Sequence, residues 1–210
     1  MTDRSDLLPG DWPTLTTELM HARRTVLPRR LVEPAPDPQQ KLAMLEAASA
    51  APDHGQLLPW RFIEVPVDQR SRLGEVFAQA LLERDPQATG EEQARAREKA
   101  DRSPWLLLVV VDAERGGDPE VDLAERILSA GCAVQNVLLM ATAAGYGSAL
   151  TSGKALKSQA LRHLFSLAPT EQALCFINIG TVGSHKPGRP RPSVDDYVSC
   201  LGQPQTTGRG

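Results

Sequence analysis

The feature that most constrains the fold is a long apolar stretch in the second half of the chain, which predicts one helix from about Glu120 to Ala144. Its richest part, residues 127–150, is long enough to cross a membrane. It is nevertheless rich in alanine and carries polar side chains such as Gln135 and Asn136. This composition favours a helix buried in a soluble protein or packed against another helix, and Gly145 is a good C-terminal stop for it.

A continuous apolar run, Trp105 to Val111, is typical of a central strand buried on both faces. Asp37 has the pattern of a helix N-cap, with Pro38 following it and Gln40 at the capping-box position. The remaining pattern predicts strands over 60–67, 146–151 and 174–182, and helices over 15–22, 37–51, 69–82, 91–102 and 155–165. The 91–102 helix is expected to carry ion pairs Glu91–Arg95 and Glu98–Arg102. These elements predict one domain of mixed helices and strands.

Charge and cysteine usage narrow the class of protein. The formal net charge is −3 and aromatic residues make up 4% of the 210 residues, which argues against a nucleic-acid-binding protein. The three cysteines are widely spaced and form no metal-ligand pattern. The N-terminal residues contain no apolar run of the kind found in signal peptides. We therefore expect a cytoplasmic protein with reduced thiols, no metal site and no membrane span.

The segment from Ala51 to Phe62 breaks a helix, makes a polar turn and enters a strand. Its prolines and glycine leave backbone N–H groups free to face a ligand. His54 in this turn is either a turn residue bonded to its own backbone or, together with Gln56, a hydrogen-bonding partner for the edge of a heterocycle.

Two basic segments lie far apart in the sequence. Arg23 and Arg24, followed by Thr25, come at the end of a predicted helix, and Lys186, Arg189 and Arg191 lie near the C-terminus. A basic pair complements a helix C-terminus, but guanidinium groups with a nearby hydroxyl also suit phosphate. Either the two segments converge on one anionic cofactor, or the segment near the C-terminus is a solvated tail.

Two glycine motifs fail as nucleotide-binding fingerprints. The sequence from Gly145 to Leu150 lacks the third glycine of a dinucleotide motif and follows a helix, not a strand. The sequence from Thr151 to Ala155 lacks both the first glycine and the metal-binding hydroxyl of a P-loop. Neither a Rossmann nor a P-loop site is predicted.

Taken in order, several segments resemble those of the FMN-dependent nitroreductase family, in its small single-domain branch. They are 23–25, 31–36, 51–62, 129–136, 145–147, 151–153 and 180–181, so the resemblance runs from about Arg23 to Tyr197. Two departures stand out: two extra residues between Thr25 and Glu33, and Ala50 where some relatives have arginine.

The resemblance implies an α+β fold with a central, mostly antiparallel sheet, flanking helices and a long central helix at a homodimer interface. The domain would span residues 15–201, with an N-terminal extension over 1–14 and a disordered tail over 202–210. We expect FMN at the subunit interface, held by Arg23, Arg24, Thr25, His54, Gln56, Leu150, Thr151, Ser152, Arg189 and Arg191. Nicotinamide contacts in relatives map to Met140, Ala141, Thr142, Ala143, Ala144 and Gly145.

The implied activity is hydride transfer from NADH or NADPH through FMN to a small acceptor such as a nitroaromatic or a quinone. The alternatives are an FMN-dependent dehydrogenase or dehalogenase on the same fold, or a flavin-binding protein without turnover. If the long helix forms the dimer core, a charge at Ala133 or Val137 is expected to disrupt the dimer.

Overall fold

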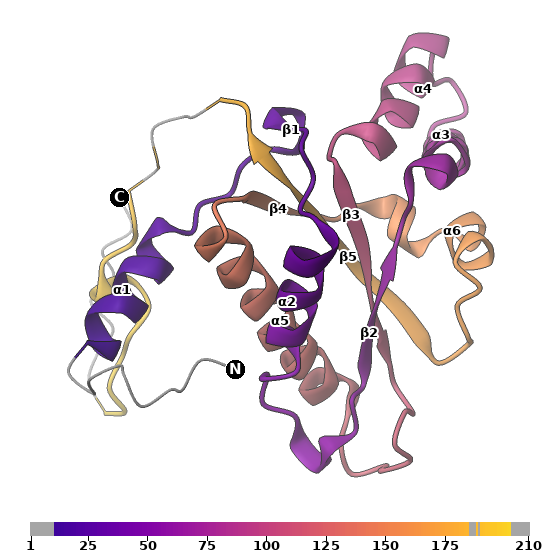
Figure 1. Cartoon of the computed structure of the whole chain (residues 1–210). Coiled ribbons are helices and arrows are strands. Elements are labelled where there is room, and N and C mark those ends of the chain that lie inside the picture. The colour runs from indigo at the N-terminus through magenta and orange to yellow at the C-terminus, as the bar shows by residue number, and fades with distance from the viewer. Residues whose placement is uncertain (1–10, 185–187, 189, 203–210) are drawn as a thin grey trace.

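A five-stranded sheet organises the chain (Figure 1). The computed structural model describes residues 11–184, 188 and 190–202. The strands are β1 (Leu31–Val32), β2 (Trp60–Glu64), β3 (Trp105–Asp112), β4 (Gly147–Thr151) and β5 (Glu171–Val182). The order is β1-β5-β3-β2, with β4 also paired to β5, and every strand pair is antiparallel. The antiparallel sheet of the expected α+β fold is therefore confirmed.

The central strand β3 is buried on both faces, as predicted, because helices cover each side of the sheet. Trp105, Leu107 and Val109 face a core shared with α2 (Pro38–Ala48) and α5 (Leu123–Ala143). The alternate residues Leu106 and Leu108 face a second core shared with α3 (Arg70–Arg84) and α6 (Gln159–Leu164). Figure 1 shows α2 and α5 on one side of the sheet and α3 and α6 on the other.

The long helix α5 starts three residues later than predicted because Asp122 is its N-cap, accepting a hydrogen bond from the Glu125 N–H. Gly145 follows its end with φ +85°, as expected for a glycine stop. By length and composition α5 is the one helix of the described residues that could span a membrane. Its inner face is instead buried against α2 and the sheet, which is the role of a core helix.

A charge at Ala133 or Val137, expected to disrupt a dimer formed on α5, would act first on the fold of the single chain. Both are fully buried in the core of their own chain, where α5 meets the sheet. The outward face of α5 carries Leu128, Gly131 and Gln135, all exposed and spaced along one stripe of the helix. A partner on α5 would therefore meet this second stripe.

The capping box predicted for α2 is present: Asp37 and Gln40 exchange hydrogen bonds of 2.8 and 2.9 Å. The amide of Asn136 on α5 donates to the Ala47 carbonyl at 3.1 Å, so this polar group is satisfied by the end of α2. The capping box fixes the start of α2, and the Asn136 bond fixes its end against α5.

Two predicted helices are each divided. Residues 91–102 form α4 (Gly90–Arg97) and the short helix η5 (Glu98–Asp101), and residues 155–165 form η6 (Lys154–Lys157) and α6. Ser158 caps α6 and thereby separates it from η6.

The first helix, α1 (Trp12–Ala22), has no buried residue and lies beside the C-terminal segment in Figure 1. The remaining short helices are η2 (Pro28–Arg30), η3 (His54–Gln56), η4 (Val67–Gln69) and η7 (Val194–Asp196).

Candidate cofactor site

The two basic segments meet at the C-terminal end of α1. The Arg191 guanidinium donates to the carbonyl oxygen of Arg23 at 2.8 Å, with longer bonds to those of Met20 and His21. A Cβ built at Gly188 would lie 3.0 Å from Cζ of Arg24, so the C-terminal segment also passes close to that guanidinium. Lys186 and Arg189 lie outside the described residues.

This basic cluster, defined here as Arg23, Arg24 and Arg191, carries mutually repelling charges. Burial and, after it, the nearby cations Arg191 and Arg24 lower the pKa of Arg23. A concentration of positive charge with partial burial is a favourable place for an anion, above all for a phosphate that guanidinium forks can bind. Arg191 of the C-terminal segment therefore lies beside the first basic segment, as convergence of the two requires.

A short stretch of chain links the basic cluster to a cavity. Thr25 forms a parallel bridge with Ser148 on β4, and the Val26 N–H donates to the Ser148 carbonyl at 2.9 Å. From Ser148 to Thr151 the strand covers about 10 Å. Beyond Thr151 lies the cofactor cavity, of about 300 Å³, into which Leu27 and Pro28 also project.

The cofactor cavity has apolar walls and a small set of polar groups. The apolar residues are Leu27, Pro28, Phe77, Leu106, Leu156 and Phe176; the polar ones are Thr151, Ser152, Asn178, Lys99 and Arg102. The main-chain N–H groups of Ser152 and Gly153 have no hydrogen-bond partner among the residues that the structure describes. Such a combination suits a flat heterocycle with polar edges.

A buried hydrogen-bond network fixes the cavity floor. The Asn178 amide donates to Thr151 Oγ1 at 2.9 Å, and Ser103 Oγ donates to Asn178 Oδ1 at 3.0 Å. Because Asn178 is bonded to Ser103 on one side and to Thr151 on the other, the Thr151 side chain is held in one orientation.

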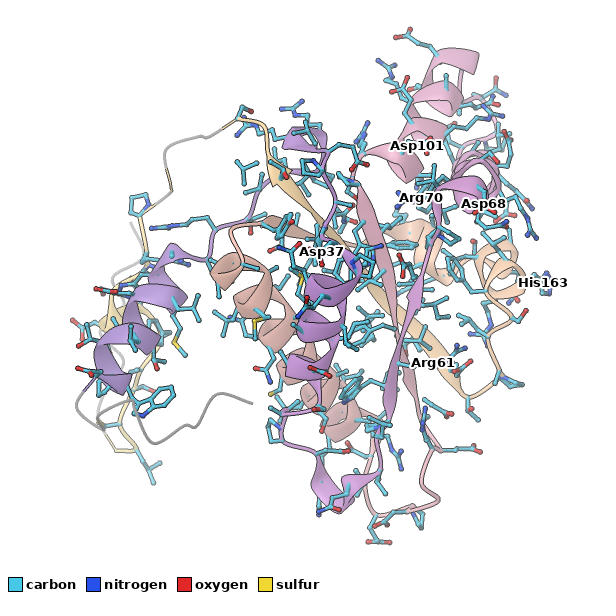
Figure 2. The ribbon with its side chains drawn as sticks, in the orientation of Figure 1. Asp37, Arg61, Asp68, Arg70, Asp101 and His163 are labelled. Carbon is cyan, nitrogen blue, oxygen red and sulfur yellow. The ribbon has the colours of Figure 1, made fainter. Side chains whose placement is uncertain are left out.

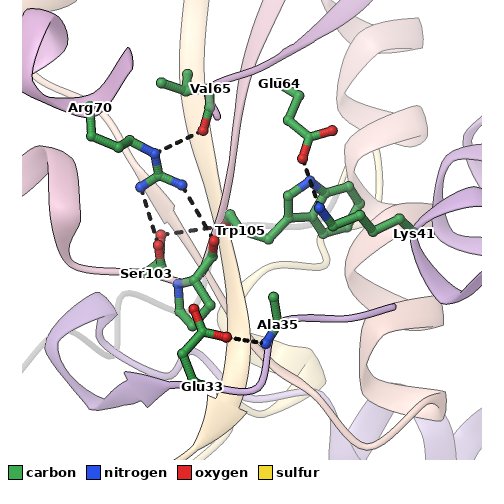
Figure 3. A network of polar contacts seen from close by, with 9 residues as sticks. Glu33, Ala35, Lys41, Glu64, Val65, Arg70, Ser103 and Trp105 are labelled. Carbon is green, nitrogen blue, oxygen red and sulfur yellow. Dashed lines mark hydrogen bonds and ion pairs between the residues drawn. The ribbon is translucent and has the colours of Figure 1, made fainter. Parts of the chain in front are cut away.

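Arg70 holds the segment next to this floor. Its guanidinium donates to the carbonyls of Val65 and Ser103 at 2.8 and 3.2 Å (Figure 3). It also donates to the carbonyl of Ala100 at 2.6 Å. Burial lowers the pKa of Arg70, and the nearby carboxylate of Asp101 partly offsets this (Figure 2). The consequence is a fixed path for residues 99–104, the segment that brings two cations to the cavity.

Those cations, Lys99 and Arg102, were missed in reading the sequence. They belong to a charged stretch, 91–102, that has the pattern of a solvated helix face. The expected Glu91–Arg95 ion pair is present at 3.1 Å, but within the described residues Glu98 and Arg102 form none. Their ideal α-helical spacing is lost because the chain changes to a tighter helix at Glu98.

The turn that contains His54 and Gln56 lies elsewhere. His54 Nδ1 is 2.7 Å from Oε2 of Glu125, in the first turn of α5, and this hydrogen bond raises the pKa of His54. Arg23 to Thr25 lie beside β4, just past the other end of α5. Residues 125 and 143 of that helix are about 27 Å apart at 1.5 Å per residue. Within one chain, therefore, His54 and the basic cluster do not share a site.

The backbone of this turn is unusual. Gly55, Gln56 and Leu58 have φ values of +70°, +53° and +47°. Positive φ at a leucine is an uncommon conformation that surrounding structure must hold in place, here through the Leu58 N–H bond to Asp53 Oδ2 at 2.7 Å. The Gln56 side chain is exposed.

The segment mapped to nicotinamide contacts forms the end of α5. Met140, Ala143, Ala144 and Gly145 are exposed, whereas Ala141 is fully buried. The Thr142 hydroxyl donates to the Leu138 carbonyl at 2.9 Å.

The protein has an α+β, nitroreductase-like fold. Its features are the antiparallel sheet, the long core helix α5, and a basic cluster linked to a cavity. The chain belongs to the nitroreductase family, whose family model matches residues 20–181. This is an oxidoreductase family, and the protein is accordingly an enzyme of that class.

Relatives and solved structures agree with this assignment. A Haemophilus influenzae protein named "Putative NAD(P)H nitroreductase" is 34% identical over 179 residues, covering 82% of this chain and 93% of that protein. A nitroreductase-like family protein from Bacillus cereus superposes with a TM-score of 0.73 at 20% identity, covering 89% of this chain and 96% of that one. An iodotyrosine deiodinase bound to FMN and 3-iodo-L-tyrosine gives a TM-score of 0.65 at 21% identity, covering 89% and 98%.

Proposed function

We propose that the protein is an FMN-dependent oxidoreductase that transfers hydride from NADH or NADPH, through FMN, to a small acceptor such as a nitroaromatic or a quinone. The observation that carries this proposal is the link between the basic cluster and the cofactor cavity. One segment, residues 23–28, and one strand, β4, join the two, so a molecule with a phosphate at one end and a heterocycle at the other fits the path between them.

The residues present suit FMN at both ends. The guanidinium groups of Arg23, Arg24 and Arg191 offer donors to the phosphate. The N–H groups of Ser152 and Gly153, which have no partner among the described residues, suit the polar edge of the ring, and Thr151 lines the same cavity. Leu150 is exposed and does not line it. Bound FMN would supply hydride and electron transfer, while the protein contributes position and electrostatics.

Lys99 and Arg102 add positive charge to the cavity wall. A fixed cation stabilises negative charge that develops on a ring during reduction. Arg23 and Arg24 do not line this cavity, whereas Lys99 and Arg102 do, so the latter two are better placed for this task.

We infer that the working form is a homodimer with two equivalent sites, in each of which the cofactor lies between the two chains. His54 and Gln56 lie far from the basic cluster of their own chain, so they can join it only across a subunit boundary. Apolar side chains left exposed on α1, on α5 and after residue 193 supply a surface for the partner. They are Trp12, Leu15, Met20, Ile127, Leu128, Val194, Tyr197 and Val198.

The electron donor is proposed on the name of the Haemophilus relative, which includes NAD(P)H. The exposed part of 140–145 stays a predicted nicotinamide contact. The burial of the inner face of α5 supports a soluble protein, and a cytoplasmic location is proposed with it.

A dehalogenase activity is the second candidate, because the FMN-bound deiodinase shares the fold. Absorbance spectroscopy of the purified protein is the first test. Bleaching of bound FMN by NADH or NADPH, and reoxidation by a nitroaromatic or quinone, are the expected results. Reoxidation by 3-iodo-L-tyrosine alone would favour the second candidate. A flavin that no nicotinamide reduces would indicate a binding protein, and a protein that takes up no FMN would refute all three.

A further inference from the structure

A second cavity, of about 550 Å³, opens beside the cofactor cavity, and five of its thirteen lining residues are cations. These positive side chains come from four elements or their ends: Arg84 from α3, Arg95 from α4, Lys99 and Arg102 from η5 and its cap, and Lys154 from η6. We call it the cationic cavity. Lys99, Arg102, Ser152 and Gly153 line both cavities, so the two are continuous.

The cations of this cavity have little counter-charge. In the part of the chain that the structure describes, Arg84, Lys99, Arg102 and Lys154 form no ion pair. Arg95 pairs with Glu91 on an exposed helix face, an interaction that is weak in water. The acidic residue lining the cavity is Glu92, whose Oε2 accepts from the N–H and hydroxyl of Thr89, each at 2.9 Å. One carboxylate among five cations leaves the lining with a net positive charge.

Gathering like charges around a concave surface is unfavourable unless an anion compensates it. The cavity adds what a bare surface cluster lacks: a volume for a ligand and two unpaired main-chain N–H groups, those of Ser152 and Gly153, on its border with the cofactor cavity. Charged side chains together with backbone N–H donors are the usual partners of carboxylate and phosphate oxygens.

We propose that the cationic cavity binds an anionic oxygen group, carboxylate or phosphate, of the small molecule that reacts in the adjacent cofactor cavity. The inference rests on the proposed function, because the reacting end of that molecule is placed next to FMN. Two sources supply the same chemistry: the phosphates of the nicotinamide dinucleotide, or an acidic group on the electron acceptor.

Binding without turnover tests the proposal. FMN-loaded, oxidised protein is titrated with 4-nitrobenzoate and with its neutral counterpart 4-nitrobenzamide, following the flavin absorbance. NADP⁺ and the phosphate-free nicotinamide riboside are titrated by calorimetry. The variant is Arg84→Gln with Arg95→Gln. The matched control, Arg72→Gln with Lys157→Gln, removes the same charge from exposed positions that do not line this cavity.

The expected result is that the variant binds a charged probe about tenfold more weakly, the loss of one charge-assisted hydrogen bond. The counterpart that lacks the anionic group, 4-nitrobenzamide or nicotinamide riboside, should bind the variant unchanged, and the control variant should bind every probe unchanged. The probe that responds identifies the source: 4-nitrobenzoate indicates an acidic acceptor, and NADP⁺ indicates the dinucleotide. Binding of the responding probe should also weaken as KCl is raised.

Three results would overturn the inference. In the first, the variant and the control bind all four probes equally. In the second, the variant binds the probes with and without the anionic group more weakly to the same extent. In the third, the variant loses FMN, which would assign the cationic cavity to the cofactor phosphate. Failure of the proposed function is distinguishable, because the unaltered protein would then take up no FMN. In that case NADP⁺ binding to the FMN-free protein, lost in the variant and kept in the control, would still support an anion site.

Discussion

The side-chain amide of Asn178 donates a 2.9 Å hydrogen bond to the hydroxyl oxygen of Thr151, and this bond ties β5 to the last residue of β4 at the cavity floor. Asn178 also accepts from Ser103 at 3.0 Å, so one buried side chain joins three segments of the sheet. Thr151 is thereby fixed by a residue whose amide nitrogen and amide oxygen both bond within the protein.

Replacing this residue should be costly. Asn178→Ala is expected to lower the free energy of unfolding by about 2–3 kcal/mol, because the buried Ser103 hydroxyl keeps only its 3.4 Å contact to Trp105 and the partly buried Thr151 loses its donor. Urea unfolding measures the effect. Asn136→Ala is a suitable comparison, since that partly buried amide donates a single bond at 3.1 Å and should cost about 1 kcal/mol. Equal losses in the two variants would contradict the network.

Arg23→Gln should weaken FMN binding about tenfold, the loss of one charge-assisted contact to phosphate. Stability without FMN should change by less than about 0.5 kcal/mol, because burial and the neighbouring cations already disfavour the charge of Arg23. Fluorescence titration with FMN and urea unfolding provide the two measurements. Arg72→Gln, at an exposed position on α3, is the control. Identical FMN affinity in both variants would remove Arg23 from the site.

Leu128→Glu should convert the proposed dimer to monomers while the fold is kept, because Leu128 is 69% exposed on the outward stripe of α5. Sedimentation velocity measures the change in mass, and circular dichroism reports the fold. Val67→Glu places the same charge on an exposed apolar residue in η4 and should stay dimeric. Ala133→Glu is expected to unfold the chain, since Ala133 is fully buried. A dimeric Leu128→Glu protein would place the interface elsewhere.

The His54–Glu125 pair should make stability depend on pH. The hydrogen bond to Glu125 raises the folded pKa of His54 above its ordinary 6.5. The pair therefore stabilises the fold fully below about pH 6.5, the value for the unfolded chain, and loses this effect as pH rises through the higher folded pKa. His54→Gln should unfold at lower urea than the unaltered protein in acid, and the gap should close in alkali. A gap that widens with pH would reverse the assignment; NMR titration of the imidazole gives the pKa directly.

Local signals predicted much of this fold. The Trp105–Val111 run predicted a doubly buried strand because covering both faces of a strand requires apolar residues at every position. Asp37 and Gln40 predicted the start of α2 because a capping box is a contact between near neighbours. Gly145 predicted the end of α5 because a glycine stop acts on the helical residues directly before it. In each case the residues that determine the structure lie close together in sequence.

The rest depends on contacts between distant residues. Helix α5 is apolar on nearly all sides, so its pattern does not distinguish the face of Ala133, which is buried in the core, from that of Leu128, which is exposed. Lys99 and Arg102 reach the cavities because Arg70 binds the carbonyl of Ala100 across 30 residues of sequence. His54 pairs with Glu125, 71 residues away, instead of bonding its own backbone. No local pattern contains such partners.

The separation of His54 from Arg23 along α5 has a genetic consequence under the proposed arrangement. Each site would combine the Arg23 end of one chain with the His54 end of the other. A mixed dimer of an Arg23→Gln chain and a His54→Gln chain would then hold one intact site and one doubly altered site. Two individually defective alleles would complement each other, whereas two alleles altered at the same end would not.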